Sequence, residues 1–149
     1  LAQGTLMCAK EIQRFGIKPK VALVSNSNYG THTDEDSVKM QQALQIVRKV
    51  DPDLEIDGEM QADAALDEKL RKQIFPETTL QGSANLLVMP NVEAANISYN
   101  LLRVNATNGI TVGPILMGLN KPVQIVTPIS TVRRIVNMIA LAAVDAQRQ

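Results

Sequence analysis

The sequence has few aromatic residues, one cysteine and no excess of charge of either sign. Its 149 residues include two tyrosines, two phenylalanines, no tryptophan and a single cysteine, Cys8. One cysteine cannot form an internal disulfide, so nothing here argues for secretion. Fifteen Lys and Arg residues balance fifteen Asp and Glu residues. Zero net charge gives no general attraction to nucleic acid, and so few aromatics give little stacking surface, which disfavours nucleic-acid binding as a main role.

Long apolar runs are also missing. No uninterrupted run approaches the ~18 residues of a membrane span, and the start at Leu1 lacks the basic and apolar regions of a signal peptide. We therefore expect a cytoplasmic protein with no membrane partner. Apolar residues make up 45% and charged residues 20% of the chain, as in ordinary globular domains. The length fits one domain, and the absence of an initial Met favours a fragment of something longer.

Helical and strand patterns alternate along the chain. Short apolar runs predict strands at 21–24, 54–56, 85–89, 110–112 and 123–126. Apolar residues at helical spacing predict helices at 5–15, 33–47, 64–74, 91–104 and 132–141. The expected boundary residues are Gly16 after the first helix, Thr33 before the second, Asn91 before the fourth, and Ser130 or Thr131 before the last. This order predicts an α/β fold with three αβα layers and a mostly parallel sheet.

Ligands of open α/β sheets bind beyond the carboxyl ends of the strands, which makes the loops after Val24, Ile56, Val88 and Val126 the candidate positions. The first loop, residues 25–33, offers five hydroxyl groups, two side-chain amides, one flexible glycine (Gly30) and the N-terminus of the predicted helix that follows. These groups suit phosphate or another anion. The loop is not a Walker motif, and an N-capping turn rich in Ser and Asn explains the same residues without a ligand.

Three carboxylates lie close together in the second loop, residues 57–63. Asp57, Glu59 and Asp63 could hold a hard cation or take part in acid–base chemistry. A hydrated turn after an edge strand explains them without any function, and we expect no metal in this domain. His32 has no second His or Cys nearby, so it is expected on the surface or as a hydrogen-bond donor to a ligand. Cys8 is expected on a packed face rather than as a nucleophile.

The last loop, residues 127–134, leads into the closing helix. Ser130 or Thr131 would cap that helix, while Arg133 and Arg134 lie near its start, where cations oppose the helix dipole. An anionic partner for the arginines would relieve this conflict. The loop offers no general base that could activate a hydroxyl nucleophile. A capped helix with solvated arginines is the alternative.

Four segments, taken in order, resemble the phosphate acetyl/butyryltransferase family. They are KVALVSNS at 20–27, DLEIDGEMQADAA at 53–65, MPNVEAANISY at 89–99 and GPILMGLNKPV at 113–123. The resemblance implies an α/β fold similar to isocitrate and isopropylmalate dehydrogenases, with two subdomains and a ligand cleft between them. Residues 1–149 then correspond to the second subdomain, and 131–147 to the closing helix that returns toward a first subdomain absent from this chain.

The resemblance also implies that the catalytic residues have been lost. Active members carry a Ser-Arg pair after the last strand and an Asp seven residues beyond that Ser, whereas this chain has Thr127, Pro128 and Arg134. Pro128 has no guanidinium for an acyl phosphate, and Arg134 cannot act as a base at neutral pH. The ligand-binding residues that we expect are Ser25, Asn26, Ser27, Gly30, Thr31, Asn96, Thr127 and Arg134.

Residues 127–138, TPISTVRRIVNM, most resemble the C-terminal transacetylase-like domain of bacterial NADP-dependent malic enzymes. That resemblance implies a regulatory domain that senses acetyl-CoA or a related anionic metabolite and contributes to a homo-oligomer. An upstream catalytic domain of the same chain would convert malate to pyruvate by oxidative decarboxylation. No G-x-G-x-x-G motif is present, so NADP and a divalent metal are expected only in that upstream domain.

Two other functions remain open from the sequence. The chain could be an active phosphate acetyltransferase that moves acetyl between phosphate and CoA through a rearranged site. It could also be a purely structural module whose helices build an oligomer.

Overall fold

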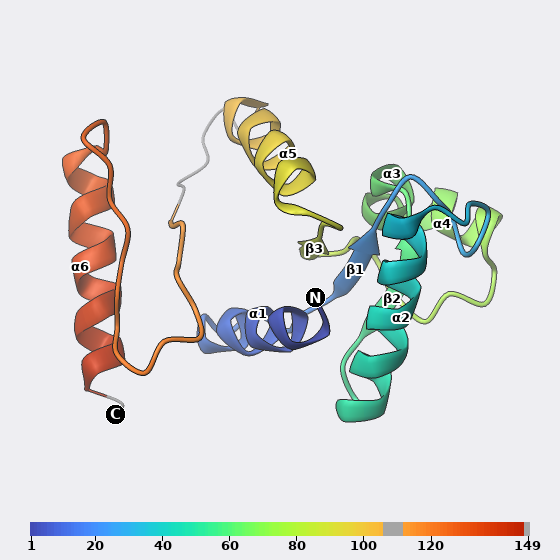
Figure 1. The fold of residues 1–149 in the computed structure, drawn as a ribbon, viewed down its shortest axis with the longest axis horizontal. Helices are drawn as coiled ribbons and strands as arrows, with labels where there is room; N and C mark the ends of the chain where they lie inside the picture. The colour runs from blue at the N-terminus through green and yellow to red at the C-terminus, as the bar shows by residue number, and fades with distance from the viewer. Residues whose placement is uncertain (106–111, 148–149) are drawn as a thin grey trace. The chain divides into compact units, whose positions relative to one another are not determined.

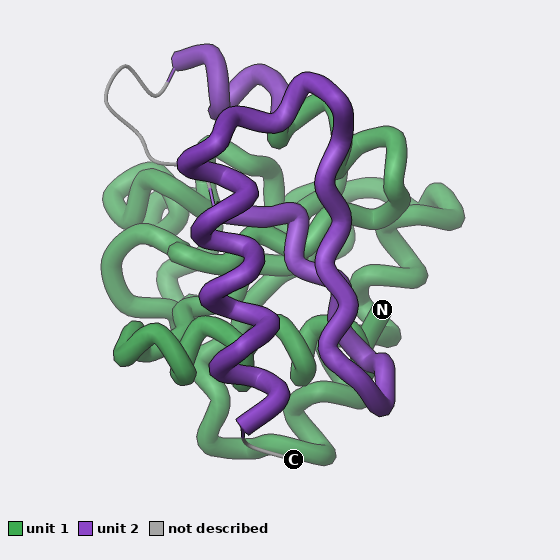
Figure 2. The backbone as a smooth tube through the Cα atoms, turned by 90° about the vertical axis from the view of Figure 1, so that its left-hand side faces the viewer, with its two compact units in different colours: residues 1–99 green, residues 100–149 purple. Residues whose placement is uncertain are grey.

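A computed structural model describes residues 1–105 and 112–147. The chain divides into two compact units, residues 1–99 and residues 100–149 (Figure 2). The first unit contains the sheet, and the second contains the closing helix (Figure 1). None of the helices in the described residues is long and apolar enough to cross a membrane.

Three parallel strands form the sheet of the first unit. They are β1 (Val21–Val24), β2 (Ile56–Met60) and β3 (Leu86–Val88), and their order in the sheet is β2-β1-β3. The central strand β1 pairs with both neighbours, so that Val21 faces Ile56 on one side and Leu86 on the other. All four residues of β1 are buried, as expected for a strand between two helical layers.

Helices cover both faces of this sheet. On one face, α1 (Ala2–Arg14) and α2 (Glu35–Val50) pack over Val21 and Leu23 in a first core cluster. On the other face, α3 (Ala62–Leu66) and the segment 80–84 pack over Ala22 and Val24 in a second cluster. Because successive strand residues point to opposite faces, the four residues of β1 divide equally between the two clusters. The α/β prediction with three layers and a parallel sheet is confirmed, while the likeness to isocitrate dehydrogenase stays a prediction.

Gly16 ends α1 as predicted. Its φ of +74° allows the left-handed turn in which Gly16 N donates to Gln13 O and Ile17 N donates to Ile12 O. The expected start of the second helix at Thr33 is wrong, since Asp34 caps α2 and its carboxylate accepts from Ser37 N at 3.1 Å. A carboxylate satisfies the free N–H groups of the first turn and also complements the helix dipole.

The caps expected for the last two helices are confirmed. α5 (Val92–Asn105) begins after Asn91, whose Oδ1 accepts from Ala94 N at 2.9 Å. α6 (Val132–Ala146) begins after Thr131, whose hydroxyl accepts from Arg134 N at 3.3 Å.

Two predicted boundaries in the middle of the chain are wrong. The strand expected at 54–56 begins at Ile56 and continues to Met60 through buried acidic residues. The single helix expected at 64–74 is two helices, α3 and α4 (Glu68–Ile74), which are divided at Asp67. Asp67 Oδ1 accepts from Lys69 N at 2.8 Å and from Leu70 N at 3.1 Å, so this carboxylate starts a new helix where a continuous one was expected.

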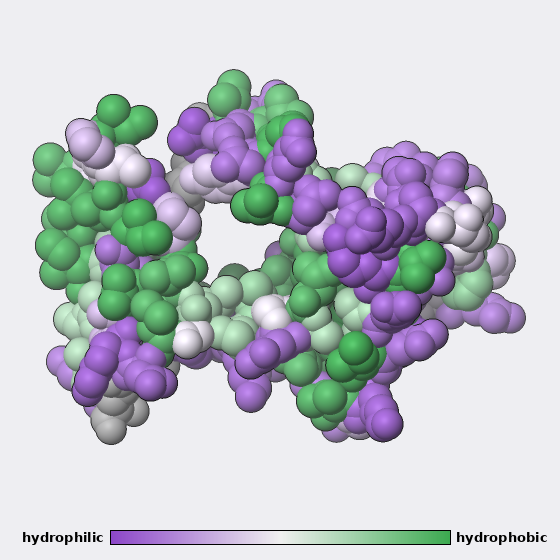
Figure 3. Space-filling view, in the orientation of Figure 1, coloured by the Kyte–Doolittle hydropathy of each residue, from purple (hydrophilic) through white to green (hydrophobic). Residues whose placement is uncertain are grey.

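The second unit lacks the strand predicted at 123–126. That segment has a single antiparallel bridge, between Ile115 and Gln124, in the described residues. Val123, Ile125 and Val126 each expose nearly half of their surface. These apolar side chains therefore lack the burial that would stabilise a longer strand here. The strand predicted at 110–112 falls mostly outside the described residues. On α6, Val132, Val136 and Ile139 are exposed along one stripe, and apolar side chains gather over this helix (Figure 3).

Candidate functional site

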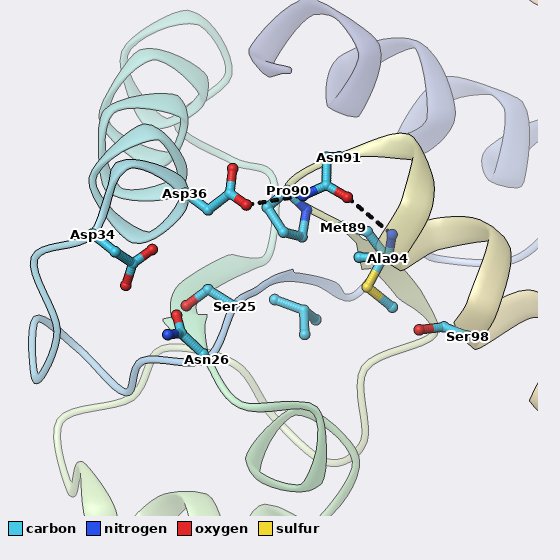
Figure 4. A pocket seen from close by; sticks show the side chains of 10 residues that line it. Ser25, Asn26, Asp34, Asp36, Met89, Pro90, Asn91, Ala94 and Ser98 are labelled. Atoms are coloured by element: carbon cyan, nitrogen blue, oxygen red, sulfur yellow. Dashed lines mark hydrogen bonds between the residues drawn. The ribbon is translucent and has the colours of Figure 1, made fainter.

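A pocket of about 440 Å³ opens in the first unit at the carboxyl ends of β1 and β3 (Figure 4). Its walls come from the end of β1, the start of α2, the end of β3 and the start of α5. In that order the lining residues are Val24, Ser25, Asn26, Asp34, Asp36, Met89, Pro90, Asn91, Ala94 and Ser98. This volume lies within the range of small-molecule sites.

The position of the pocket follows from the strand order. From β1 the chain continues through α2 to β2 on one side, while β3 lies on the other side and leads into α5. The connections that follow β1 and β3 therefore diverge, and they leave a crevice between α2 and α5 above the strand ends. In open α/β sheets such a switch point is where ligands bind.

The pocket combines apolar, amide, hydroxyl and carboxylate groups. Val24, Met89 and Ala94 provide apolar surface, while Asn26, Asn91 and the serines provide uncharged polar groups. Asp36 Oδ2 accepts from Asn91 Nδ2 at 2.9 Å and so ties the start of α2 to the start of α5 (Figure 4). The described residues that line this pocket include no Lys or Arg.

Asp34 adds a negative charge to the same wall. Hydrogen bonds from the backbone N–H and the hydroxyl of Ser37 lower the pKa of the Asp34 carboxyl below its ordinary value. Asp36 forms an ion pair with Lys39 one turn along α2. The sequence predicted an anionic ligand at the start of α2. That position instead carries carboxylates of the protein itself.

The loop 25–33 directs its donors to a buried carboxylate of β2. Ser27 Oγ donates to Glu59 Oε1 at 2.7 Å, and Gly30 N donates to the same oxygen at 2.7 Å. Glu59 is only 1% exposed. The loop thus does bind an anionic group, as its composition suggested, and that group is the side chain of Glu59.

Further hydrogen bonds fix the part of this loop that reaches the pocket. Ser25 Oγ accepts from Ser27 N at 2.9 Å, and Asn26 Oδ1 accepts from the Ser37 hydroxyl at 2.9 Å. Gln61 Nε2 donates to Asn26 O at 3.0 Å. The pocket-lining residues of the loop are held from β2, from α2 and from within the loop.

Asp57 is also buried, and the expectation of a hydrated turn at 57–63 is wrong for it. Its Oδ1 accepts from Arg48 Nη2 at 3.0 Å and from Gly58 N at 2.9 Å. Its Oδ2 accepts from the Thr78 hydroxyl at 2.6 Å and from Thr79 N at 2.9 Å. Protein donors replace the water that a carboxylate otherwise needs, which is why a charged residue lies inside β2.

Tyr29 lies beside Asp57 and stacks on Phe75, with ring centroids 4.1 Å apart. Burial, the largest cause, raises the pKa of Tyr29 to about 12, although a hydrogen bond to Thr78 opposes the shift. Because the pKa is raised on folding, the neutral phenol favours the folded state. This stabilisation is fully present below the ordinary tyrosine pKa of about 10 and is lost as pH rises through about 12.

We expect alkaline titration to reveal this shift directly. In a Tyr99→Phe variant Tyr29 is the remaining tyrosine, and its near-ultraviolet phenolate absorbance should develop with a midpoint near pH 12. The Tyr29→Phe variant is the control, since it should lose that late transition. A midpoint at about pH 10 for Tyr29 in the folded chain would contradict the assigned environment.

The structure brings together only part of the predicted site. Ser25 and Asn26 line the pocket, while Ser27 and Gly30 contact Glu59 and Thr31 Oγ1 accepts from Asn28 N at 3.0 Å. Whether Ser27, Gly30 or Thr31 also binds a ligand stays a prediction.

The other predicted ligand-binding residues lie outside the pocket lining. Asn96 is exposed on α5. In the second unit, Thr127 N donates to Ser130 Oγ at 2.9 Å in the turn before α6, and Arg134 lies in the first turn of that helix. Ligand binding by these three residues also stays a prediction.

The sequence identified the loop after Val88 as a candidate position but gave none of the residues of the opposite wall, which are Met89, Pro90, Asn91, Ala94 and Ser98. These residues could have been chosen from the same rule, because they follow the end of a strand that reaches the same edge of the sheet. The acidic side chains of Asp34 and Asp36 were missed as well, because the loop was judged by its hydroxyl and amide groups.

The chain is similar to a family of acyltransferases and to part of the malic enzymes. Residues 1–143 match the family described as phosphate acetyl/butaryl transferase. The NADP-dependent malic enzyme of Escherichia coli K12 is 60% identical over 149 residues, which is 100% of this chain and 20% of that protein. The phosphate acetyltransferase of Helicobacter pylori J99 is 37% identical over 147 residues, which is 99% of this chain and 28% of that protein.

Solved structures give the same pattern. A phosphotransacetylase from Streptococcus pyogenes has a TM-score of 0.90 and 32% identity, and the match covers 99% of this chain and 45% of that one. EutD phosphotransacetylase from Staphylococcus aureus has a TM-score of 0.86 and 34% identity, covering 97% and 45%. The chain thus spans about a fifth of the malic enzymes that it matches and less than half of these solved proteins.

Proposed function

Because the chain belongs to the phosphate acetyl/butaryl transferase family, we propose that it is a non-catalytic regulatory part of a malic enzyme and that it binds acetyl-CoA. The observation that carries the proposal is its 60% identity to an NADP-dependent malic enzyme along the whole chain. In this proposal a catalytic domain upstream in the same polypeptide decarboxylates malate oxidatively and holds NADP and a divalent metal.

The residues before α6 support a role without transferase chemistry. Thr127 lies in a tight turn with Ser130, and its hydroxyl is 3.2 Å from the Ser130 hydroxyl. Pro128 has no side-chain donor, and the guanidinium of Arg134 offers hydrogen-bond donors and no acceptor for a proton. No group at these positions can deprotonate the thiol of CoA, which a transfer to CoA requires.

The side chains that line the pocket support binding of the acyl end of acetyl-CoA there. Its apolar surface and its amide and hydroxyl groups suit the acyl group and the uncharged, amide-containing arm of CoA. Asp34 and Asp36 disfavour phosphate at the same place by like-charge repulsion. The proposal therefore places the acyl end of the ligand between α2 and α5 and its phosphates elsewhere.

The second unit supports a larger assembly. α6 exposes Val132, Val136 and Ile139 by 78%, 58% and 63% along one stripe. Burial of such a stripe is favourable by about 25 cal/mol per Å² of apolar surface. We therefore retain the proposal that residues 1–149 are a second subdomain, that the helix at 131–147 packs on a first subdomain, and that the protein is a homo-oligomer.

Calorimetric titration of the full-length protein with acetyl-CoA tests the function. Heat of binding is expected for the wild type, and Ala94→Leu should weaken the affinity about tenfold or more because the added isobutyl group fills the pocket. Ala95→Leu is the matched control, since Ala95 is the next residue of α5 and does not line the pocket.

Three outcomes would contradict the proposal. Absence of heat at millimolar acetyl-CoA would show that acetyl-CoA is not the ligand. Equal affinity of the two leucine variants for acetyl-CoA would show that the ligand does not bind in this pocket. Formation of acetyl-CoA from acetyl phosphate and CoA by the isolated chain would replace the regulatory role with that of an active acetyltransferase.

A further inference from the structure

We propose that Glu59 is a positioning residue whose buried carboxylate holds the loop 25–33 in the shape that presents Ser25 and Asn26 to the pocket. The carboxylate occupies the place that a bound anion would take in a loop of this composition. The effect on ligand affinity rests on the proposed function, whereas the effect on the loop does not.

The contacts of Glu59 come from two places in the loop. Its Oε1 receives the Ser27 hydroxyl and the Gly30 N–H, both at 2.7 Å, and its backbone oxygen receives Tyr29 N at 2.8 Å. The N–H groups of two consecutive residues, Tyr29 and Gly30, thus both donate to Glu59. Their φ values of 51° and 87° turn these N–H groups toward the same residue.

Ser27 transmits this constraint to the pocket. Besides donating to Glu59, its hydroxyl accepts from His32 N at 3.0 Å, and its own N–H donates to Ser25 Oγ at 2.9 Å. Ser27 is fully buried, so its position is fixed by these partners rather than by water. A path of hydrogen bonds therefore runs from the Glu59 carboxylate to the Ser27 hydroxyl, and from the Ser27 backbone N–H to the Ser25 hydroxyl in the pocket wall.

Loss of the carboxylate would remove the acceptor at 2.7 Å from the buried Ser27 hydroxyl and from the Gly30 N–H. A hydrogen bond to a charged acceptor is stronger than a neutral one, and an unsatisfied buried donor bears a desolvation penalty. In Glu59→Ala the Gly30 N–H loses its acceptor and the Ser27 hydroxyl keeps only Thr31 Oγ1, at 3.3 Å, so we expect the loop to move toward water. Glu59→Gln keeps an oxygen at nearly the same distance from β2, so it should retain most of the loop geometry.

His32 offers a direct readout because it is the one histidine of the sequence and lies in this loop. Proton NMR of the 149-residue chain should show the ring signals of His32 at denatured-chain positions in Glu59→Ala and at wild-type positions in Glu59→Gln. Acetyl-CoA affinity of the full-length protein should fall about tenfold or more in the alanine variant and stay within about threefold in the glutamine variant. Glu77→Ala, at an exposed position, is the control.

Unchanged His32 signals in a folded Glu59→Ala chain would overturn the proposal, as would equal loss of affinity in the alanine and glutamine variants. If Glu59→Ala does not fold, Glu59→Asp replaces it, because the shorter side chain withdraws the carboxylate from the Ser27 hydroxyl and the Gly30 N–H while the bond from His32 N to Ser27 stays available. That change should still move the His32 signals, and unchanged signals would again overturn the proposal. If the wild type binds no acetyl-CoA, the proposed function fails while the His32 signals still decide the role of Glu59.

Discussion

Replacing Arg71 with methionine is expected to lower the free energy of unfolding by on the order of 4 kcal/mol, the largest loss that we anticipate for a single side chain. Arg71 is completely buried. Its Nη1 donates to Ala64 O at 2.9 Å and to Ala65 O at 3.3 Å. Its Nη2 donates to Leu80 O at 3.0 Å and to Gly82 O at 2.6 Å.

The size of this effect follows from what the substitution leaves behind. Four backbone carbonyls keep their positions in α3 and in the segment 80–84, and methionine offers none of them a donor. The carbonyls of Ala64 and Ala65 lie in the last turn of α3, where C=O groups and the helix dipole favour a cation, although Ala65 O also accepts from Ala84 N at 2.9 Å. Removing the buried charge is expected to recover less free energy than is lost, because four oxygens compensate the two terminal nitrogens of the guanidinium and Nε alone among its nitrogens has no hydrogen-bond partner in the described residues.

Urea denaturation of the chain measures the change, with Lys72→Met as the matched control on the same helix. Lys72 is exposed and forms an i,i+4 ion pair with Glu68, so its loss should be within about 0.5 kcal/mol. Equal effects of the two substitutions would show that the carbonyl contacts of Arg71 contribute little to stability.

Gly58→Ala should destabilise the chain by about 3 kcal/mol or more, and the variant is expected to accumulate poorly. Gly58 lies in β2 with a φ of +135°, a conformation that residues with a Cβ rarely adopt. A Cβ at this position would lie 2.6 Å from Leu23 O of the central strand. Neither the backbone of β1 nor that of β2 can yield without disturbing the pairing between them.

Gly4→Ala provides the opposite control. Gly4 lies inside α1, and a Cβ there would meet nothing within 4 Å. The substitution should stabilise the chain by about 0.5–1 kcal/mol because alanine has the higher helix propensity. Thermal unfolding of both variants separates them, and a Gly58→Ala chain as stable as the wild type would contradict the close approach of β2 to β1.

The helical layers and the central strand could be predicted because their signals are local. The apolar run at 21–24 and the glycine after α1 each identify an element from neighbouring residues. β2 could not be predicted in the same way, since Asp57 and Glu59 resemble solvated residues unless their donors are known. Those donors come from distant parts of the chain, including Ser27, Arg48 and Thr78.

The candidate site shows the same division. Ser25 and Asn26 could be predicted because they follow a strand directly. The facing wall, with Asn91 and Ser98, depends on β3 lying next to β1 rather than next to β2. Strand order is a tertiary property that the periodicity of single segments does not contain.

The two core clusters place different limits on how this sequence can diverge. The cluster under α1 and α2 is built from larger residues such as Leu23, Met40 and Ile56, which can exchange volume with one another. The cluster on the other face relies on Ala22, Ala64, Ala65 and Ala84, so every change at these alanines other than to glycine adds atoms against a closely packed backbone. In homologous sequences we therefore expect core residues of the first cluster to change together, so that a larger side chain at one position is offset by a smaller one at another. Side-chain volumes in the second cluster should stay nearly constant.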